Sequence, residues 1–182
     1  MLARILASSA SAQPNAWALA ATYIAKLGNL IINECALTDK SGSVKFSVRN
    51  GFATSSIAQT GPTDPKIKQT IQVPAITLDE YVLKCGMSPH FIKIDVEGAE
   101  AKVLRGGENL LSLPPDSAPV ICLEYSSSNY ARFGFTTAQV RDLLALKGYS
   151  LFALDSRGTH PAAESDLNST DIINIVASKK RL

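Results

Sequence analysis

The sequence has 182 residues, of which 46% are hydrophobic and 19% are charged. This apolar content excludes an intrinsically disordered chain, and the length suits one globular domain. Eighteen basic residues and sixteen acidic residues leave a net charge of +2, without the basic excess that is typical of nucleic-acid-binding proteins. No apolar run reaches the roughly 18 residues that a membrane-spanning helix requires, so no membrane span is expected.

The cysteines and the N-terminus say little about the compartment. Cys35, Cys85 and Cys122 are odd in number and widely spaced, which predicts free thiols among apolar residues. Residues 1–12 read MLARILASSASA, whose apolar run is too short for a signal peptide, although its Ser and Ala content would suit a transit peptide. The compartment stays open, with the cytoplasm as the default.

The first half of the chain predicts one helix and then three strands. Residues 19–27 carry apolar side chains four residues apart and predict an amphipathic helix. Residues 30–37 predict a short buried strand, and residues 44–48 alternate as in a half-exposed strand. A Gly-, Ser- and Pro-rich loop is expected at 51–68, after which residues 70–76 alternate again and can pair with the strand before that loop.

The next segment predicts a capped helix, a strand and an interrupted helix. Thr77 begins a capping box, and the helix that follows is expected to run through Lys84 and to end at Gly86. Residues 91–96 (FIKIDV) predict the clearest strand of the chain. A helix from Gly98 is expected to be interrupted at the Gly pair 106–107 and to resume through residue 111.

The last third predicts strands at 120–125, 149–154 and 171–177, with a helix at 136–148 and a polar loop at 156–169. Strands alternate with helices through the middle of the chain, which predicts an α/β domain with a mostly parallel sheet. The last two strands follow each other without a predicted helix, so a C-terminal antiparallel hairpin is expected at one edge.

The segment 91–100 (FIKIDVEGAE) is the most informative for function. By the two-residue period of a strand, Lys93, Asp95 and Glu97 share one face of a strand that is expected to be buried on both faces. Three ionisable groups there are costly unless they are paired or form a site. Asp95 and Glu97 lie at the carboxyl end of the strand, where open α/β sheets bind ligands.

Two interpretations of these acids stay open. In the structural one, Lys93 pairs with Asp95, while Glu97 and Glu100 lie near a helix N-terminus, where the dipole favours carboxylates. In the functional one, Glu124 ends the next apolar strand and approaches the same crevice as Asp95 if the two strands are neighbours. A carboxylate there could act as a general base, or two or three could hold a divalent cation.

Other polar residues are weaker candidates. His90 precedes the strand at 91–96 and His160 lies in the predicted polar loop, and each is expected to be a solvated or structural histidine. Residues 126–130 (SSSNY) form either a turn or a segment that hydrogen-bonds a hydroxylated substrate.

The segment FIKIDVEGAEAKVLRGG (91–107) resembles the signature of FkbM-type methyltransferases, and the resemblance extends from about residue 13 to the C-terminus. LIINECALTDKSGSVKF (30–46) is similar to the third strand of that family and its following turn, and VPAITLDEYV (73–82) to the segment that leads into the fourth strand. VICLEY (120–125) and GYSLFAL (148–154) fit the fifth and sixth strands.

The resemblance implies a Rossmann-like class I methyltransferase sheet that binds S-adenosylmethionine and usually transfers a methyl group to a hydroxyl. It implies that Cys35, Ala36 and Leu37 contact the adenine. The acid that binds the ribose would be replaced by Gln13, which lacks the charge of a Glu. The segment from Asp95 to Gly98 would face both cofactor and substrate, with Asp95 as the preferred base and Glu97 and Glu124 as alternatives.

The glycines depart from the family pattern. None of the eleven stands before residue 28, so the Gly-rich cofactor loop is absent from this sequence. Residues 1–12, in which 3–7 could be a remnant of the second strand, are therefore expected to precede a partial methyltransferase domain at 13–182. The first strand and part of the second would be missing, which makes cofactor binding doubtful and leaves a sheet edge open for self-association.

Three functions follow from these features. The first is S-adenosylmethionine-dependent methylation of a small hydroxylated molecule or sugar. The second is a non-catalytic methyltransferase-like module that binds a partner through its open edge. The third is a metal-dependent α/β enzyme that uses Asp95, Glu97 and Glu124.

Overall fold

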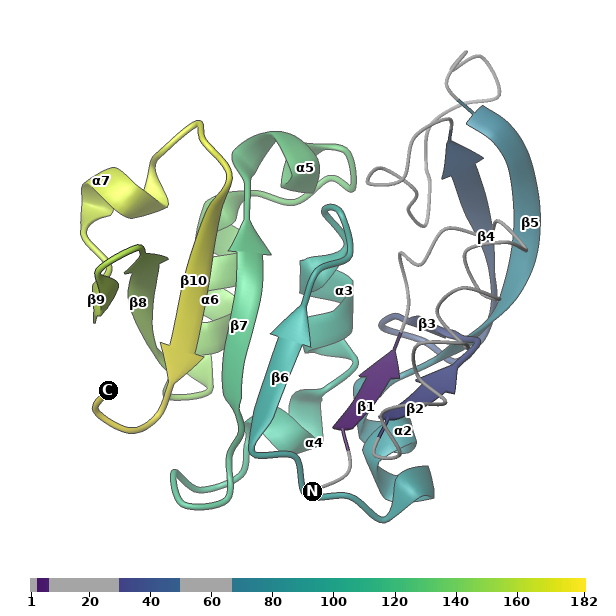
Figure 1. The fold of residues 1–182 in the computed structure, drawn as a ribbon, viewed down its shortest axis with the longest axis horizontal. Coiled ribbons are helices and arrows are strands. Elements are labelled where there is room, and N and C mark those ends of the chain that lie inside the picture. The colour runs from purple at the N-terminus through teal and green to yellow at the C-terminus, as the bar shows by residue number, and fades with distance from the viewer. Residues whose placement is uncertain (1–2, 7–29, 50–66) are drawn as a thin grey trace.

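The computed structural model describes residues 3–6, 30–49 and 67–182, with side chains described for 33–47, 67 and 69–182. Over these ranges the chain forms three sheets and a set of short helices (Figure 1). The amphipathic helix predicted at 19–27 and most of the loop predicted at 51–68 lie outside the described residues. In the described part, no helix has the length and apolar character needed to cross a membrane.

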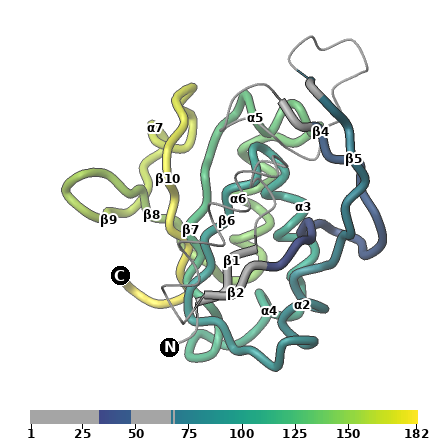
Figure 2. Tube along the Cα trace, turned by 45° about the vertical axis from the view of Figure 1, so that its right-hand side comes forward, coloured from purple at the N-terminus to yellow at the C-terminus, as the bar shows by residue number. Residues whose placement is uncertain are grey.

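The largest sheet carries the second half of the chain. In spatial order its strands are β6 (Phe91–Ile94), β7 (Val120–Tyr125), β10 (Ile173–Ser178), β8 (Ser150–Asp155) and β9 (Gly158–Pro161). β6 and β7 are parallel, whereas β10 is antiparallel to both β7 and β8, and β9 is antiparallel to β8. The strands predicted at 149–154 and 171–177 therefore do pair antiparallel, but β10 lies inside the sheet and β9 forms its edge (Figure 2).

The other strands form two smaller sheets. In the three-stranded sheet, β5 (Ile67–Ile76) lies between β3 (Ala36–Leu37) and β4 (Gly42–Arg49). β4 and β5 are antiparallel, as predicted from their alternation. In the two-stranded sheet, β1 (Ala3–Leu6) runs parallel to β2 (Leu30–Asn33), so residues predicted as a strand remnant do form a strand.

Three predictions about the strands are wrong. The sheets are not mostly parallel, because four of the seven described strand pairs are antiparallel. Short connections such as the β8–β9 turn can join only antiparallel neighbours. The strand predicted at 30–37 is split between two sheets, because the chain turns where the Cys35 amide donates to the carbonyl of Asn33 at 3.0 Å. The polar loop predicted at 156–169 contains β9 and a helical turn, α7 (Glu164–Leu167).

The remaining helices are α2 (Leu78–Cys85), α3 (Glu100–Arg105), α4 (Glu108–Leu111), α5 (Ser127–Ala131) and α6 (Thr137–Leu146). The boundaries predicted for α2 and α6 are confirmed to within two residues, whereas α3 begins two residues after the predicted Gly98 and α5 was not predicted as a helix. The Thr77 side chain accepts the Glu80 amide at the start of α2, and Gly86 ends that helix in the left-handed conformation. Thr136 and Gln139 form a complete capping box at α6. The helix predicted from Gly98 is interrupted between α3 and α4 as expected.

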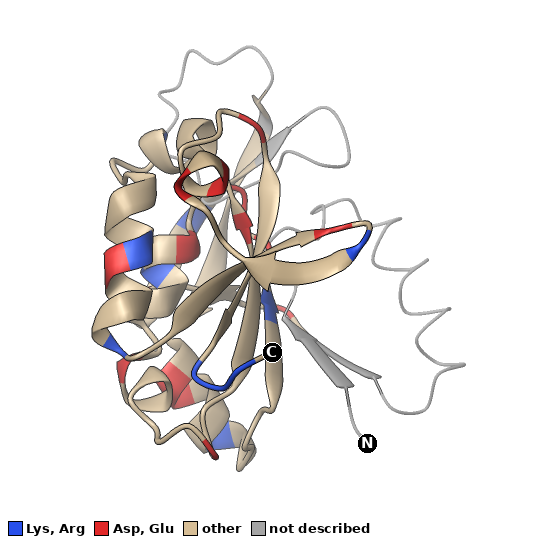
Figure 3. Cartoon of the chain, turned by 90° about the vertical axis from the view of Figure 1, so that its left-hand side faces the viewer, with Lys and Arg blue, Asp and Glu red and all other residues tan. Residues whose placement is uncertain are grey.

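The hydrophobic core lies between the five-stranded sheet and the helices on one of its faces (Figure 3). Ile121, Leu123 and Ile175 project from the central strands and are fully buried, together with Val103 of α3 and Leu144 of α6. Burial of side chains of this size is the main stabilising contribution to such a fold, at about 1.5–3 kcal/mol each. The three cysteines are free, as predicted.

The opposite face of β6 is open, which corrects the expectation that this strand is buried on both faces. Ile94 is 3% exposed, whereas Phe91 is 58% exposed and Lys93 is also exposed. The ionisable groups of this segment therefore lie on a solvent-accessible face, where they need no buried partner.

Candidate active site

Three carboxylates meet where β6 and β7 end. β6 and β7 are parallel neighbours with Ile94 opposite Leu123, so both strands point their carboxyl ends in the same direction (Figure 1). Asp95 follows β6 directly, and Glu124 is the penultimate residue of β7. One carboxylate oxygen from each of Asp95, Glu97 and Glu124 lies within 4.8 Å of the others. The predicted proximity of Asp95 and Glu124 is thus confirmed, and Glu97 joins them.

The turn after β6 has an unusual backbone. Glu97 has φ of +56° and Gly98 has φ of +106°, and Glu97 is the one non-glycine residue with positive φ in the described part of the chain. A side chain at Gly98 would overlap the backbone carbonyl of Asn129, which packs against the turn from α5. Glycine at this position therefore serves both the backbone conformation and the close approach of α5.

Helix α5 holds the third acid in place. The Asn129 Nδ2 donates to Glu124 Oε2 at 3.1 Å, and the Tyr130 hydroxyl donates to the backbone carbonyl of Glu124 at 2.6 Å. The Ser126 side chain caps the helix by accepting the Asn129 amide. The segment 126–130, for which a turn or a substrate contact was predicted, is thus a helix that orients Glu124. Sequence reasoning missed the role of Asn129, although a serine-capped segment directly after Glu124 was the available signal.

Lys93 forms the ion pair that the structural interpretation predicted. Its Nζ lies 3.6 Å from Asp95 Oδ2 and 3.2 Å from Asn174 Oδ1. The side chains of Lys93 and Asp95 are 41% and 52% exposed, and solvent-exposed pairs of this kind contribute little to stability. The ion pair and the acidic cluster coexist, so the two interpretations are not exclusive.

Glu100 is buried rather than exposed at a helix N-terminus. It has no exposed surface, and its Oε1 accepts the Val96 amide at 3.0 Å. Burial raises the pKa of Glu100 to about 7, against hydrogen bonds from the Val96, Gly98 and Glu100 amides, and the charge of Glu124 raises it further. The sequence placed Glu100 near a helix N-terminus, as observed, but it did not predict the burial, because nothing local distinguishes a buried helix-start glutamate from an exposed one.

Comparisons with known proteins identify the family of this chain and a structure of similar fold. A family model described as the methyltransferase FkbM domain matches residues 11–151, which include all three acids of the cluster. The chain belongs to the FkbM methyltransferase family. A crystal structure of the methyltransferase FkbM from Methylobacillus flagellatus KT is similar in fold, with a TM-score of 0.54 and 11% sequence identity over 97% of this chain. This chain spans 36% of the length of that one, and a search of the curated proteins finds no match.

The cofactor residues implied by the FkbM resemblance lie on a different sheet from the cluster. Ala36 and Leu37 form β3 and are buried in the core, at 1% and 7% exposure. Cys35 is half-buried before β3, and burial raises the pKa of its thiol, while Lys84 of α2 lowers it. Gln13 lies outside the described residues. The structure thus brings the predicted acids together, and it buries two of the three predicted adenine contacts, Ala36 and Leu37.

The chemistry available to the FkbM cluster is that of carboxylates at a solvent-accessible edge. Such a group accepts a proton from a substrate hydroxyl when it lies within hydrogen-bond reach. Three carboxylate oxygens at this spacing are also ligands of the kind that hard divalent cations take.

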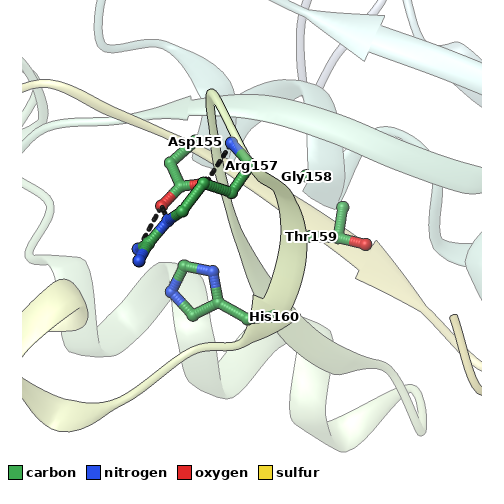
Figure 4. A pocket seen from close by; sticks show the side chains of 5 residues that line it. All are labelled: Asp155, Arg157, Gly158, Thr159 and His160. Atoms are coloured by element: carbon green, nitrogen blue, oxygen red, sulfur yellow. Dashed lines mark hydrogen bonds and ion pairs between the residues drawn. The ribbon is translucent and has the colours of Figure 1, made fainter.

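Two hollows on the described surface lie away from the cluster. One is at the β8–β9 turn, where Arg157 folds onto Asp155 with a 2.7 Å ion pair and His160 lies beside them (Figure 4). The other lies at the opposite ends of β6 and β7 and includes His90. His160 Nε2 is 3.8 Å from Asp166 Oδ2. Neither histidine belongs to the acidic cluster, so the prediction of structural or solvated histidines stands.

Proposed function

We propose that this chain takes part in S-adenosylmethionine-dependent transfer of a methyl group to a hydroxyl of a small molecule or sugar. The observation that carries the proposal is the meeting of Asp95, Glu97 and Glu124 within 4.8 Å, at the carboxyl ends of two parallel strands inside the FkbM domain. Ligands of open α/β sheets bind at this edge.

Asp95 is the proposed general base. It is exposed at the edge, so an acceptor molecule can reach it, and it accepts the proton of the acceptor's hydroxyl. Glu124, fixed by Asn129, orients the hydroxyl by accepting a hydrogen bond. S-adenosylmethionine supplies the electrophilic methyl group when it is bound. The proton of the acceptor hydroxyl ends on Asp95.

The described residues supply the acids that would bind the methyl acceptor. They do not supply a complete binding site for the cofactor. The side chains of Ala36 and Leu37 are buried, so they offer little surface to an adenine. We therefore assign this chain the acid–base edge and assign the cofactor to none of its described side chains.

Calorimetric titration of the purified chain with S-adenosylmethionine tests the cofactor part of the proposal. Binding at micromolar affinity would support it, and absence of heat at millimolar cofactor would contradict catalysis by this chain alone.

Transfer of a labelled methyl group to a panel of hydroxylated small molecules and sugars then tests the reaction. Asp95→Asn is expected to lower kcat by about 10²- to 10⁴-fold.

Asp116→Asn is the matched control for Asp95→Asn. Asp116 is also an exposed aspartate in an ion pair with a lysine, 3.1 Å from Lys180, but it lies at the opposite ends of the strands. Equal losses of kcat in both variants would remove Asp95 from the mechanism.

Repeating the calorimetric titrations with Mn²⁺ decides the metal-dependent alternative. Binding of Mn²⁺ that Asp95→Asn abolishes would favour that alternative.

The open edge of β6 favours a second function, a non-catalytic module that binds a partner chain. Among the described strands β6 pairs only with β7, and its first residue, Phe91, is 58% exposed. An unpaired strand edge is a template for pairing with another chain. Light scattering at rising concentration should then show self-association that Phe91→Glu weakens. Leu146→Glu, which changes an 83% exposed leucine on α6, should have no effect, and a monomer at all concentrations would contradict self-association.

A further inference from the structure

Two glutamates begin neighbouring helices in the same way and differ in burial. Glu100 is the first residue of α3 and Glu108 the first of α4, and neither helix has a side-chain cap on its N-cap residue. Glu100 has no exposed surface, whereas the Glu108 side chain is 73% exposed. An exposed glutamate already interacts favourably with a helix dipole. The dipole therefore does not explain why Glu100 is buried.

The buried carboxylate is only partly satisfied. Oε1 accepts the Val96 amide at 3.0 Å, but Oε2 has no hydrogen-bond partner among the described residues. Burying a carboxylate oxygen without a partner costs free energy. A hydrophobic residue at the start of α3 would avoid this cost and fill the same space. What it could not do is accept the Val96 amide.

That amide lies at the start of the left-handed turn. Val96 is followed by Glu97 at φ +56° and Gly98 at φ +106°. A non-glycine residue in this conformation is strained, and it persists only where its surroundings hold it. The Glu100 carboxylate holds the turn from the side of α3, and the backbone of Asn129 packs against Gly98 from the side of α5.

Glu100 also interacts with groups on β7 and α5. Glu124 of β7 acts on the Glu100 carboxyl through its charge. On α5, burial raises the pKa of Tyr130, with further contributions from Glu100, Tyr125 and Glu124. Glu100 is thus buried close enough to Glu124 and Tyr130 to interact with both of them electrostatically.

We propose that Glu100 is a positioning residue of the acidic cluster, which holds the Val96 amide and thereby keeps Glu97 left-handed and Asp95 and Glu97 directed at Glu124. A contribution of Glu100 to catalysis rests on the methyl transfer proposed above. The positioning of the turn by Glu100 does not rest on it, because the hydrogen bond and the turn are present without cofactor or acceptor.

Nuclear magnetic resonance on the full ¹⁵N- and ¹³C-labelled chain tests the proposal with two readouts. The Val96 amide shift reports the charge of its acceptor, and the ¹³Cα and ¹³Cβ shifts of Glu97 report its left-handed backbone. In the wild type, the pH dependence of the Val96 amide shift should include a step with a midpoint near 7, the pKa to which burial raises Glu100. Glu100→Gln keeps an acceptor oxygen without the charge, so it should abolish this titration and keep Glu97 left-handed.

Glu100→Ala removes the acceptor, so it should lose both the Val96 titration and the left-handed shifts of Glu97. Glu108→Ala should keep both of these readouts. A Glu97 that stays left-handed in folded Glu100→Ala would overturn the proposal. If that variant does not fold, persistence of the Val96 step near pH 7 in Glu100→Gln would overturn it instead. Where methyl transfer is measurable, Glu100→Ala should lower kcat more than it raises the KM for the acceptor, and Glu100→Gln should recover most of the loss. If the chain transfers no methyl group, both resonance readouts still test the positioning role of Glu100. Failure of the proposed function can therefore be told apart from failure of this proposal.

Discussion

The backbone carbonyl of Asn129 occupies the space that a side chain at Gly98 would need. This contact joins the turn after β6 to helix α5 after β7, so it couples the two segments that carry the acidic cluster. The arrangement of the cluster therefore depends on the absence of a side chain at Gly98 as well as on its three carboxylates.

Gly98→Ala should destabilise the fold and separate these two segments. The change adds strain at φ +106° and overlap with a backbone atom that cannot rotate away, which together should cost about 2–5 kcal/mol. Gly134→Ala is the control, because Gly134 also has positive φ, at +74°, but has open space around it, so only about 1 kcal/mol is expected. Urea unfolding of the two variants measures the difference. Equal losses would show that the Asn129 contact is not tight.

Asn129→Ala should release Glu124 with little effect on stability. The variant removes the 3.1 Å hydrogen bond to the Glu124 carboxylate, for a cost of about 1 kcal/mol in unfolding free energy. Methyl transfer should fall about tenfold, because the carboxylate is no longer held in one orientation. Asn109→Ala, on the exposed start of α4, should leave the transfer rate unchanged. A normal rate in Asn129→Ala would show that the orientation of Glu124 does not matter.

The folded chain should lose stability as the pH rises through neutrality, because Glu100 then loses its proton. Its pKa is raised from 4.5 to about 7 in the folded chain, so the folded state binds the proton more tightly than the unfolded state does. The stabilisation is complete below pH 4.5 and is lost as the pH rises through 7. Between pH 5 and 8 the loss should be about 2–3 kcal/mol.

Denaturant unfolding of Glu100→Gln at these two pH values isolates that contribution. The variant should lose most of the difference between pH 5 and 8 that the wild type shows, while Glu108→Gln should keep it. The same pH dependence in the wild type and in Glu100→Gln would mean that the buried carboxyl does not titrate in this range.

Asp79→Ala should weaken the packing of α2 on α4. The two Asp79 carboxylate oxygens accept the Asn109 amide at 2.8 Å and the Leu110 amide at 2.9 Å, which supplies from α2 the cap that α4 lacks. Loss of this cap should cost about 1–2 kcal/mol in thermal or urea unfolding. Asp142→Ala removes an exposed aspartate of α6 and should cost much less. An equal effect of the two substitutions would contradict the capping role.

Local chemistry predicted much of the helical structure and the members of the cluster. Thr77, Gly86 and Thr136 act on backbone groups within a few residues, so their effect on helix boundaries is visible in sequence. The two-residue period of a strand likewise placed Asp95 and Glu97 on one face, and the apolar run that ends at Glu124 predicted its position.

The tertiary structure alone decided how these pieces meet. Antiparallel pairing inserted β10 between β7 and β8, and formed β9 from a segment with no strand pattern, because hydrogen bonds between distant segments outweigh weak local preferences. The burial of Glu100 and the bond from Asn129 to Glu124 depend on packing of α3 and α5 against the ends of β6 and β7. The sequence determined which acids could meet, and only the folded chain, through contacts that no local pattern encodes, determined what holds them together.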